Sequence, residues 1–284
     1  MVMLCIFNNH YNNYGVKTMK IYVVTHKEIN QKNSSIRQKI KVGDPILGQD
    51  YINDSEGENI SSKNPYYCEL TALYWIWKNS KESVVGLEHY RRHFITNVSV
   101  FGFKLLSENK INKYLKKYDV IIPYYIKNNK TVVEAYYEGE KIKNHVSSDI
   151  DCIEEIVREF YPNEYKDFYT YFHSKSLKAP YNMFICKKEI IDKYCEWLFE
   201  LFAIAEKRID YVNRIGNQKR VFGYLSERLF GYWIQKNKLT PKGCPVINSE
   251  QFLELSKLKR TRFVLSFYLN KMKYRLRGYL MYKV

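Results

Sequence analysis

The chain has 284 residues, of which 45% are hydrophobic, so it is long and apolar enough for one large or two small globular domains. No apolar run approaches the roughly 20 residues that a membrane-spanning helix needs, and no such helix is predicted. The 46 Lys and Arg residues exceed the 30 Asp and Glu residues by a formal net charge of +16, which favours a polyanionic partner: nucleic acid, anionic lipid or a phosphorylated substrate.

The six cysteines are scattered along the chain and form no Cys-x-x-Cys pair, so a zinc knuckle is not predicted. The apolar run at residues 1–7 is too short, and has too little positive charge before it, for a secretory signal. Free thiols and the missing signal together predict a cytoplasmic protein.

Residues 21–25 predict the first strand, and residues 1–18 before it are interpreted as an N-terminal appendage. A long polar loop follows, and loops of this length in compact domains are often functional. Asn64 and Pro65 then predict the start of a helix that runs to about residue 78, with Asn64 as its cap.

The segment from Ser83 to Phe94 is the densest in functional groups. Its apolar run, 84–87, predicts a buried strand that ends in Glu88-His-Tyr-Arg-Arg92. In open α/β sheets ligands bind at the carboxyl ends of strands, and neighbouring arginines can pair with phosphate oxygens. An edge strand that runs into a solvated basic turn is the alternative. The density of polar groups favours a binding site.

Strands and helices continue to alternate in the rest of the chain. Predicted strands cover 119–123 and 179–186, and predicted helices cover 107–117, 149–161, 162–173, 187–208 and 219–236. Residues 124–149 are predicted to be irregular. The alternation predicts an α/β domain in which a sheet is flanked by helices.

Six motifs between residues 20 and 240 resemble a bacterial family of capsular and exopolysaccharide biosynthesis glycosyltransferases, long carried as a domain of unknown function. The motifs are Asn59-Ile-Ser-Ser-Lys-Asn64, Tyr67-Cys-Glu-Leu-Thr-Ala-Leu-Tyr-Trp-Ile-Trp-Lys-Asn79, Gly86-Leu-Glu-His-Tyr-Arg-Arg92, Tyr181-Asn-Met-Phe-Ile185, Tyr194-Cys-Glu-Trp-Leu-Phe199 and Gly223-Tyr-Leu-Ser-Glu-Arg-Leu229.

The resemblance implies a GT-A-like nucleotide-binding domain with a mixed sheet over residues 19–245. It also implies a UDP-sugar donor and a polyprenyl-linked oligosaccharide acceptor at the inner face of the plasma membrane. Some members are associated with galactofuranosyl transfer. The implied reaction is therefore inverting transfer of a hexosyl group, galactofuranosyl or galactosyl, in capsule, exopolysaccharide or O-antigen biosynthesis.

GT-A enzymes usually hold Mn²⁺ or Mg²⁺ through an Asp-x-Asp motif at the end of a central strand. Here that strand ends in Glu88-His89-Tyr90, so the motif is absent. Glu88 and His89 would form only a partial metal site, and whether the reaction requires a divalent metal stays open. Arg91 and Arg92 could neutralise the leaving diphosphate instead.

Glu227 is the candidate general base, because inverting transfer needs a carboxylate to deprotonate the acceptor hydroxyl and GT-A enzymes commonly bring one from a late helix. An ion pair with Arg228 or Lys219 on a solvated helix face is the alternative. Glu88 and Asp149 are the next candidates for catalysis, with a helix cap as the favoured alternative for Asp149.

Further polar residues are assigned to the two substrates. The donor-binding candidates are Thr25, His26, Asp54, Asn59, Lys63, His89, Tyr90, Arg91 and Arg92. The acceptor-binding candidates are His145, Tyr181, Asn182 and Arg228. A turn-stabilising role is the alternative for Asn182. His89 and His93 could share a metal only if their segment were helical.

The C-terminal residues 246–284 predict a basic helical tail. Nine Lys and Arg residues and no acidic residue lie in 257–284, with leucines that fall near one helix face. Such a helix is typical of binding to an anionic membrane surface, and a helix packed on the domain is the alternative. We expect a chain that lacks 257–284 to fold and to bind the donor.

Two other functions stay open at this point. The basic balance and the many aromatic residues also suit a nucleic-acid-binding protein. The interleaved acidic residues in the rest of the chain argue against it and predict no nucleic-acid partner. A sugar-phosphate transferase of the same pathway is the third possibility, and no oligomeric state is predicted.

Overall fold

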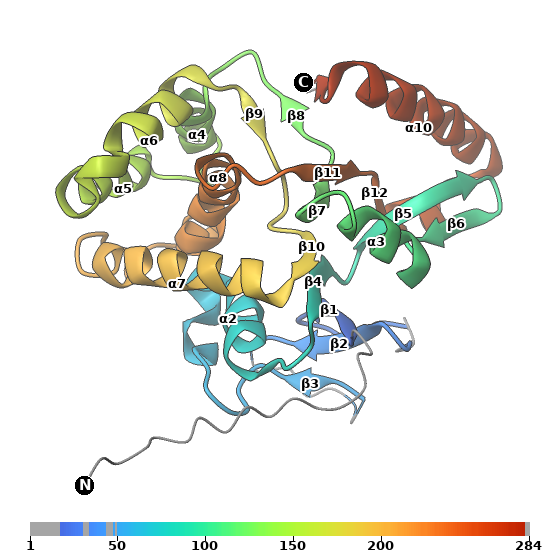
Figure 1. Cartoon of the computed structure of the whole chain (residues 1–284), viewed down its shortest axis with the longest axis horizontal. Helices are drawn as coiled ribbons and strands as arrows, with labels where there is room; N and C mark the ends of the chain where they lie inside the picture. The colour runs from blue at the N-terminus through green and yellow to red at the C-terminus, as the bar shows by residue number, and fades with distance from the viewer. Residues whose placement is uncertain (1–17, 31–33, 44–47, 49, 282–284) are drawn as a thin grey trace, which may run out of the picture.

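The computed structural model describes residues 18–30, 34–43, 48 and 50–281. The predicted N-terminal appendage therefore lies outside the described residues, apart from Thr18. A mixed sheet forms the centre of the molecule, in the order β11-β7-β10-β4-β1-β2-β3 (Figure 1). Its strands are β1 (Met19–Thr25), β2 (Arg37–Lys41), β3 (Ile52–Asn53), β4 (Val84–His89), β7 (Val120–Pro123), β10 (Phe184–Lys187) and β11 (Pro241–Cys244).

Strands β1 to β4 run parallel to one another, and β10 runs antiparallel to both β4 and β7. Residues that follow β1, β2, β3 and β4 therefore meet the residues that precede β10 at one edge of the sheet. We call this edge the carboxyl edge. It is the edge at which ligands bind in open α/β sheets.

Two smaller groups of strands extend the sheet. β5 (Arg92–Ser99) turns back from β4 and pairs with β6 (Gly102–Leu105) and β12 (Val246–Asn248). A separate three-stranded sheet joins β8 (Ile126–Lys127), β9 (Leu177–Lys178) and β13 (Leu280–Met281).

Helices cover both faces of the central sheet (Figure 1). Those on one side are α1 (Asn64–Tyr67), α2 (Leu70–Asn79), α7 (Lys188–Ala205) and α8 (Val221–Lys236), with α4 (Val132–Lys141), α5 (Ser147–Phe160) and α6 (Pro162–Ser174) outside them. Those on the other side are α3 (Glu108–Leu115), α9 (Ser249–Glu254) and α10 (Lys257–Arg277). The 3-10 turns η1 (Ser61–Lys63) and η2 (Gly216–Arg220) precede α1 and α8.

The central strands are apolar on both faces because both faces are covered. On β4, Val85 and Leu87 pack in the core under α2, α7 and α8, whereas Val84 packs in the core on the α3 side. Gly86 lies between them, where a Cβ atom would stand 2.8 Å from Ile185. A glycine at this position therefore lets β10 approach β4.

The predicted α/β architecture with a mixed sheet is confirmed, and several local predictions are wrong. Lys63 is the N-cap of α1 and Asn64 its first residue, so Asn64 is not the predicted cap. The helix predicted over 64–78 is two helices, because Cys68 has a φ of 53° and breaks it. The segment predicted to be irregular contains α4, which a capping box of Thr131 and Glu134 begins. The strand predicted over 179–186 spans only Phe184–Lys187.

The predicted tail shares the sheet with the predicted domain. β12 pairs with β5 across the boundary that we placed at 245/246. Phe267 of α10 packs with the cluster of β5 and α9, and Tyr274 stacks on Tyr124 with ring centroids 3.9 Å apart. Removing 257–284 would expose these surfaces, so a chain without them would lose part of its core, contrary to the sequence-based expectation that it folds. None of the described helices is long and apolar enough to cross a membrane.

Candidate active site

The carboxyl edge begins with the turn between β4 and β5. Tyr90 and Arg91 form this turn, and His26, which follows β1, packs edge-on against Tyr90 with ring centroids 5.2 Å apart. Burial lowers the pKa of His26, and the positive charges of Lys27, Arg91 and Arg220 lower it further. Arg91 lies beside the Tyr90 ring, and its buried Nε has no hydrogen-bond partner in the described part of the chain. This corner therefore has a positive potential and an unused donor.

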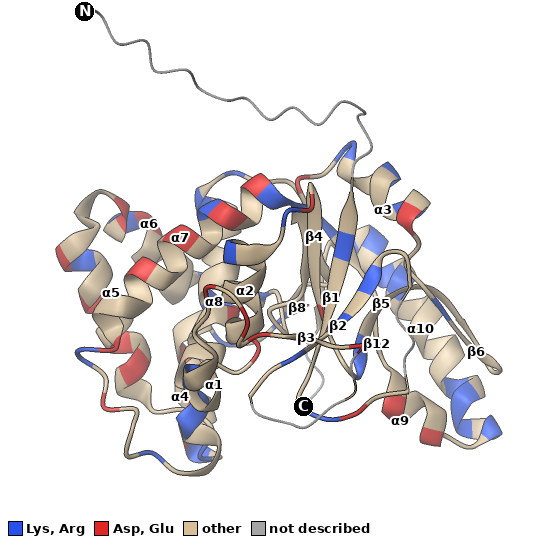
Figure 2. Cartoon of the chain, turned by 90° about the horizontal axis from the view of Figure 1, so that it is seen from below, with Lys and Arg blue, Asp and Glu red and all other residues tan. Residues whose placement is uncertain are grey.

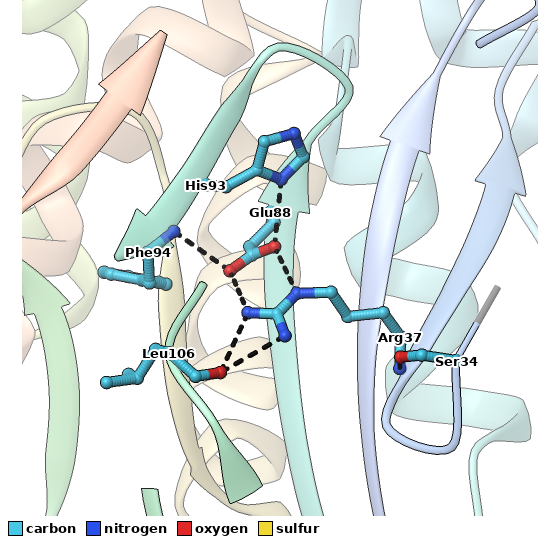
Figure 3. Close-up of polar contacts among 6 residues, drawn as sticks. All are labelled: Ser34, Arg37, Glu88, His93, Phe94 and Leu106. Atoms are coloured by element: carbon cyan, nitrogen blue, oxygen red, sulfur yellow. Dashed lines mark hydrogen bonds and ion pairs between the residues drawn. The ribbon is translucent and has the colours of Figure 1, made fainter. Parts of the chain in front are cut away.

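The neighbouring Glu88 points into the protein (Figure 3). Arg37 donates from Nε and Nη2 to its two carboxylate oxygens, both at 3.0 Å, and the Phe94 N–H donates at 3.0 Å. The His93 Nδ1 lies 3.1 Å from Oε2. Burial alone would raise the pKa of Glu88, but Arg37 and His93 outweigh burial and hold it at about 2. Glu88 is fully buried, so it joins β2, β4 and β5 and is not placed to act as a base.

His89 points to the opposite face, as neighbouring residues of a strand do. Its Nε2 lies 2.6 Å from the carbonyl oxygen of Tyr181, and Arg92 lies over the Tyr181 ring at 4.5 Å. Glu88 and His89 therefore do not converge on a metal. His89 and His93 lie on β4 and β5, so the helical geometry that a shared metal would need is not present. No group of three or more His, Cys, Asp or Glu residues gathers for a metal within the described residues.

Tyr181 and Asn182 form the turn before β10, and both have positive φ, at 76° and 50°. Asn182 donates to Glu69 Oε1 at 2.8 Å and to the Gly223 carbonyl at 3.1 Å. Its Oδ1 accepts from the Ser226 hydroxyl at 3.1 Å. With these contacts Asn182 joins the start of α2 to α8, as the turn-stabilising alternative for this residue implies.

Arg220, at the start of α8, is a site residue that the sequence analysis missed. Its Nε donates to Cys68 Sγ at 3.2 Å, and its guanidinium lies beside the Tyr224 ring at 5.4 Å. Its charge acts on the pKa of His26, so Arg220 lies between the β4–β5 turn and α8. The basic pair Lys219-Arg220 directly before an apolar helix is the sequence signal that could have identified it.

Beyond Arg220, the next turns of α8 line a cavity of about 580 Å³ that α4 and β9 close. Glu227 lies in it with a side chain 20% exposed, and Arg228 Nη1 donates to its Oε2 at 3.2 Å. His145 lines the same cavity, and burial, reinforced by Arg228, lowers its pKa to about 4. Lys178 lies there too, and burial lowers its pKa. The cavity thus holds the carboxylate of Glu227 with His145, Lys178 and Arg228, and its lining also includes Glu138 and Lys130, which pair with each other at 2.6 Å.

Asp149 does not reach this cavity. Arg214 donates to both of its oxygens at 2.5 Å, and the side chain is almost fully buried. Burial raises its pKa, and Arg214 opposes that rise. Val146 is the N-cap of α5, so the predicted cap is also wrong for Asp149. Of the predicted catalytic carboxylates, only Glu227 is accessible.

Four predicted donor-binding residues are engaged elsewhere. The Thr25 hydroxyl donates to the Lys27 carbonyl at 2.6 Å, and Asn59 donates to two carbonyls of its own loop. Lys63 pairs with Glu206 at 2.7 Å. Asp54 is fully buried beside Thr71; burial raises its pKa to about 6, and the Thr71 side chain opposes that rise. None of the four belongs to the group at the β4–β5 turn.

We call the group His26, Tyr90, Arg91, Arg220, Tyr224, Glu227 and Arg228 the site strip. It runs from the β4–β5 turn over the junction of α1 and α2 to the cavity beside α8. Its arginines can bind an anion, and its one carboxylate can accept a proton.

Comparisons with known proteins bear on the family and the fold. The sequence profile of a family described as "Domain of unknown function (DUF4422)" matches residues 20–238. The chain is also similar to a solved apo structure of WbbM, a bifunctional glycosyltransferase, with 30% identity and a TM-score of 0.67 over 81% of this chain. It spans 45% of that chain, so it corresponds to under half of WbbM. No curated protein matches significantly. The predicted GT-A-like fold is confirmed by this likeness.

Proposed function

The chain belongs to this DUF4422 family, and on that premise we propose that it is a glycosyltransferase that moves a hexosyl group, galactofuranosyl or galactosyl, from a UDP-sugar to a lipid-linked oligosaccharide. The observation that carries the proposal is the site strip, in which arginines and one accessible carboxylate lie at the carboxyl edge of a GT-A-like sheet. The likeness to a bifunctional glycosyltransferase at 30% identity supports it.

Arg91 and Arg220 would bind the diphosphate of the donor. Arg91 has a buried Nε without a partner among the described residues, and Arg220 stands at the N-terminal end of the 16-residue helix α8. Guanidinium groups and a helix N-terminus both favour phosphate oxygens, and they stabilise the negative charge that develops on departing UDP. The carboxylates and imidazoles near this corner do not converge, so the residues present do not fit a resident Mn²⁺ or Mg²⁺ ion.

Glu227 would act as the general base. Its carboxylate takes the proton of the acceptor hydroxyl while the hydroxyl oxygen attacks the anomeric carbon, and the bond from that carbon to the diphosphate breaks on the opposite face. The anomeric configuration therefore inverts, and UDP leaves. Arg228 orients the carboxylate from 3.2 Å, and His145 faces the same cavity as a neutral group that can hydrogen-bond to sugar hydroxyls.

The proposed setting is capsule, exopolysaccharide or O-antigen synthesis at the inner face of the plasma membrane. An acceptor carried on a polyprenyl chain would be held at that surface. The family resemblance of the six motifs supports this setting, as does the excess of basic residues at the C-terminal end of the chain.

Incubation with radiolabelled UDP-sugars and a polyprenyl-linked oligosaccharide tests the proposal. We expect label to enter the lipid fraction with release of UDP, and UDP to bind in the presence of a chelator. Release of UMP with transfer of a sugar phosphate would identify a sugar-phosphate transferase instead. Absence of both UDP-sugar binding and transfer, with tight binding of an oligonucleotide, would contradict the proposal and favour the nucleic-acid alternative.

A further inference from the structure

Helix α10 has two apolar faces, of which the fold uses one. Successive helix residues turn by about 100°, so the apolar positions can be placed around its axis. Phe263, Phe267 and Tyr274 fall on the side that packs on β5, α9 and Tyr124. Tyr274 also fills the space over Gly243, where a Cβ atom would stand 2.1 Å from its hydroxyl oxygen. This side holds the helix firmly on the domain.

The opposite side carries an exposed apolar row, which we call the outer stripe. Its five residues fall within about 40° of one line along the helix. The helix has 21 residues and is therefore about 31 Å long. Their exposed fractions are 66, 63, 52, 54 and 80% for Leu258, Leu265, Leu269, Met272 and Leu276. A row of this kind is unusual on a monomer surface and marks an interaction site.

Basic side chains border the outer stripe on both sides. The exposed ones are Lys257, Lys259, Arg262, Lys273, Arg275 and Arg277, and no acidic residue lies in α10 (Figure 2). Arg262 falls inside the row itself, where a long side chain can lay its methylene groups along an apolar surface and keep its charge in the polar layer above. An apolar row with a basic border is complementary to a surface that is apolar below and anionic on top.

The same charges disfavour a second copy of α10 as the partner. The spacing of Leu265, Leu269, Met272 and Leu276 matches a coiled-coil seam. The positions that would flank that seam include Lys259, Lys273 and Arg275 and no acidic residue. Pairing two such helices would bring like charges together along the interface, which is unfavourable.

We propose that the outer stripe docks the enzyme on an anionic lipid surface, with α10 lying flat in the interface. This docking rests on the proposed function, because it would bring the enzyme to a lipid-linked acceptor. Binding to the lipid surface itself requires neither the donor nor the acceptor. A cavity of about 240 Å³ lies between α10 and the turn at Pro180 and Tyr181. Phe263 and Phe267 line this cavity from the inner side of α10, so a bilayer on the outer stripe would lie on the far side of the helix from Tyr181.

Sedimentation of the full chain with vesicles tests the proposal without donor or acceptor. The vesicles contain either phosphatidylcholine alone or phosphatidylcholine mixed with phosphatidylglycerol, at low and at moderate salt. One variant replaces Leu265, Leu269 and Leu276 with serine. A matched variant replaces three exposed apolar residues away from α10, Phe160, Val212 and Ile215, with serine. Circular dichroism checks that both variants keep the fold.

We expect the full chain to bind the mixed vesicles and to bind phosphatidylcholine far more weakly. The leucine variant should lose on the order of a hundredfold in partition coefficient, because partial burial of each leucine adds several-fold. Arg262→Gln with Lys273→Gln should lose roughly fivefold per charge and flatten the salt dependence. The matched variant should bind as the wild type does.

Three outcomes would overturn the proposal. They are failure of the wild type to bind mixed vesicles, equal binding by the leucine and matched variants, and a dimer in solution that the leucine substitutions dissociate. The last would identify the outer stripe as a self-association surface. Transfer to a water-soluble acceptor analogue is measured in parallel, so that loss of lipid docking is distinguished from loss of the proposed activity.

Discussion

The β4–β5 turn and the first turns of α8 both lie at the carboxyl edge, yet they direct their polar side chains differently. At the β4–β5 turn, Glu88 points into the core and contacts both Arg37 and His93, whereas Tyr90 and Arg91 belong to the site strip. On α8, Glu227 faces a cavity and Ser226 points inward to Asn182. A carboxylate in a polar motif can therefore be structural in one element and accessible in the next.

Replacing either Glu227 or Glu88 with glutamine tests the comparison. The larger effect on turnover is expected for Glu227→Gln, on α8. Glu227→Gln removes the proposed base with little change of shape, and we expect transfer to fall by roughly 10²–10⁴-fold. UDP affinity and the free energy of unfolding should stay within about 0.5 kcal/mol of the wild type. Steady-state transfer and calorimetric UDP binding measure this, with Glu196→Gln on α7 as the control. Normal transfer by Glu227→Gln would show that Glu227 is not the general base.

Glu88→Gln should act on stability instead. It leaves the buried Arg37 without its counter-charge, which costs about 3–5 kcal/mol for pairs of this kind. Urea unfolding measures the change in free energy, and UDP binding is compared at a temperature where the variant is still folded. If Glu88→Gln were as stable as the wild type but inactive, the carboxylate would have to act in the reaction, and the contrast with Glu227 would fail.

The arginines of the site strip should affect donor binding and turnover together. We expect Arg91→Ala and Arg220→Ala each to lower turnover by about a hundredfold, because each would stabilise charge on the leaving diphosphate. Arg92→Ala should have a smaller effect, since Arg92 lies over the Tyr181 ring. Arg208→Ala, which removes a surface ion pair with Glu159, is the control. Wild-type transfer in both Arg91→Ala and Arg220→Ala would show that neither residue binds the donor diphosphate.

The remaining prediction concerns the pH dependence of stability. The pKa of Glu88 is held at about 2, below its usual value of 4.5, so its stabilising contribution is present above about pH 4.5 and is lost as the pH falls toward 2. The loss amounts to about 3 kcal/mol at most. Asp54 acts with the opposite sign at higher pH, because its pKa is raised to about 6 and its burial destabilises the fold as the pH rises toward that value.

The difference between wild type and Glu88→Gln isolates the Glu88 contribution, because both chains contain Asp54. Urea midpoints of the two proteins should converge as the pH falls from about 4.5 to about 2. If the difference between the two urea midpoints stayed constant over this pH range, the stabilisation by Glu88 would not depend on its charge.

Local sequence patterns predicted many of the strands and helices correctly. The apolar runs that became β1, β4 and β7 are long enough to be identified as buried strands, and the periodic helices α5 to α8 begin and end close to their predicted bounds. The helix α4 could have been found as well, since Thr131-Val-Val-Glu134 is a capping box. The break at Cys68 could not, because nothing in its neighbours requires a positive φ there.

The sequence by itself determined the α/β class, the motifs of the carboxyl edge, the basic C-terminal helix and Glu227 as a candidate base. Those features depend on local periodicity and residue chemistry. Tertiary structure decided that Glu88 is buried, because its partner Arg37 lies 51 residues away on another strand. It also decided that Arg220 joins the site and that α10 has an outer stripe. Each of these depends on which distant surfaces meet when the sheet and helices pack, and no local pattern specifies that pairing.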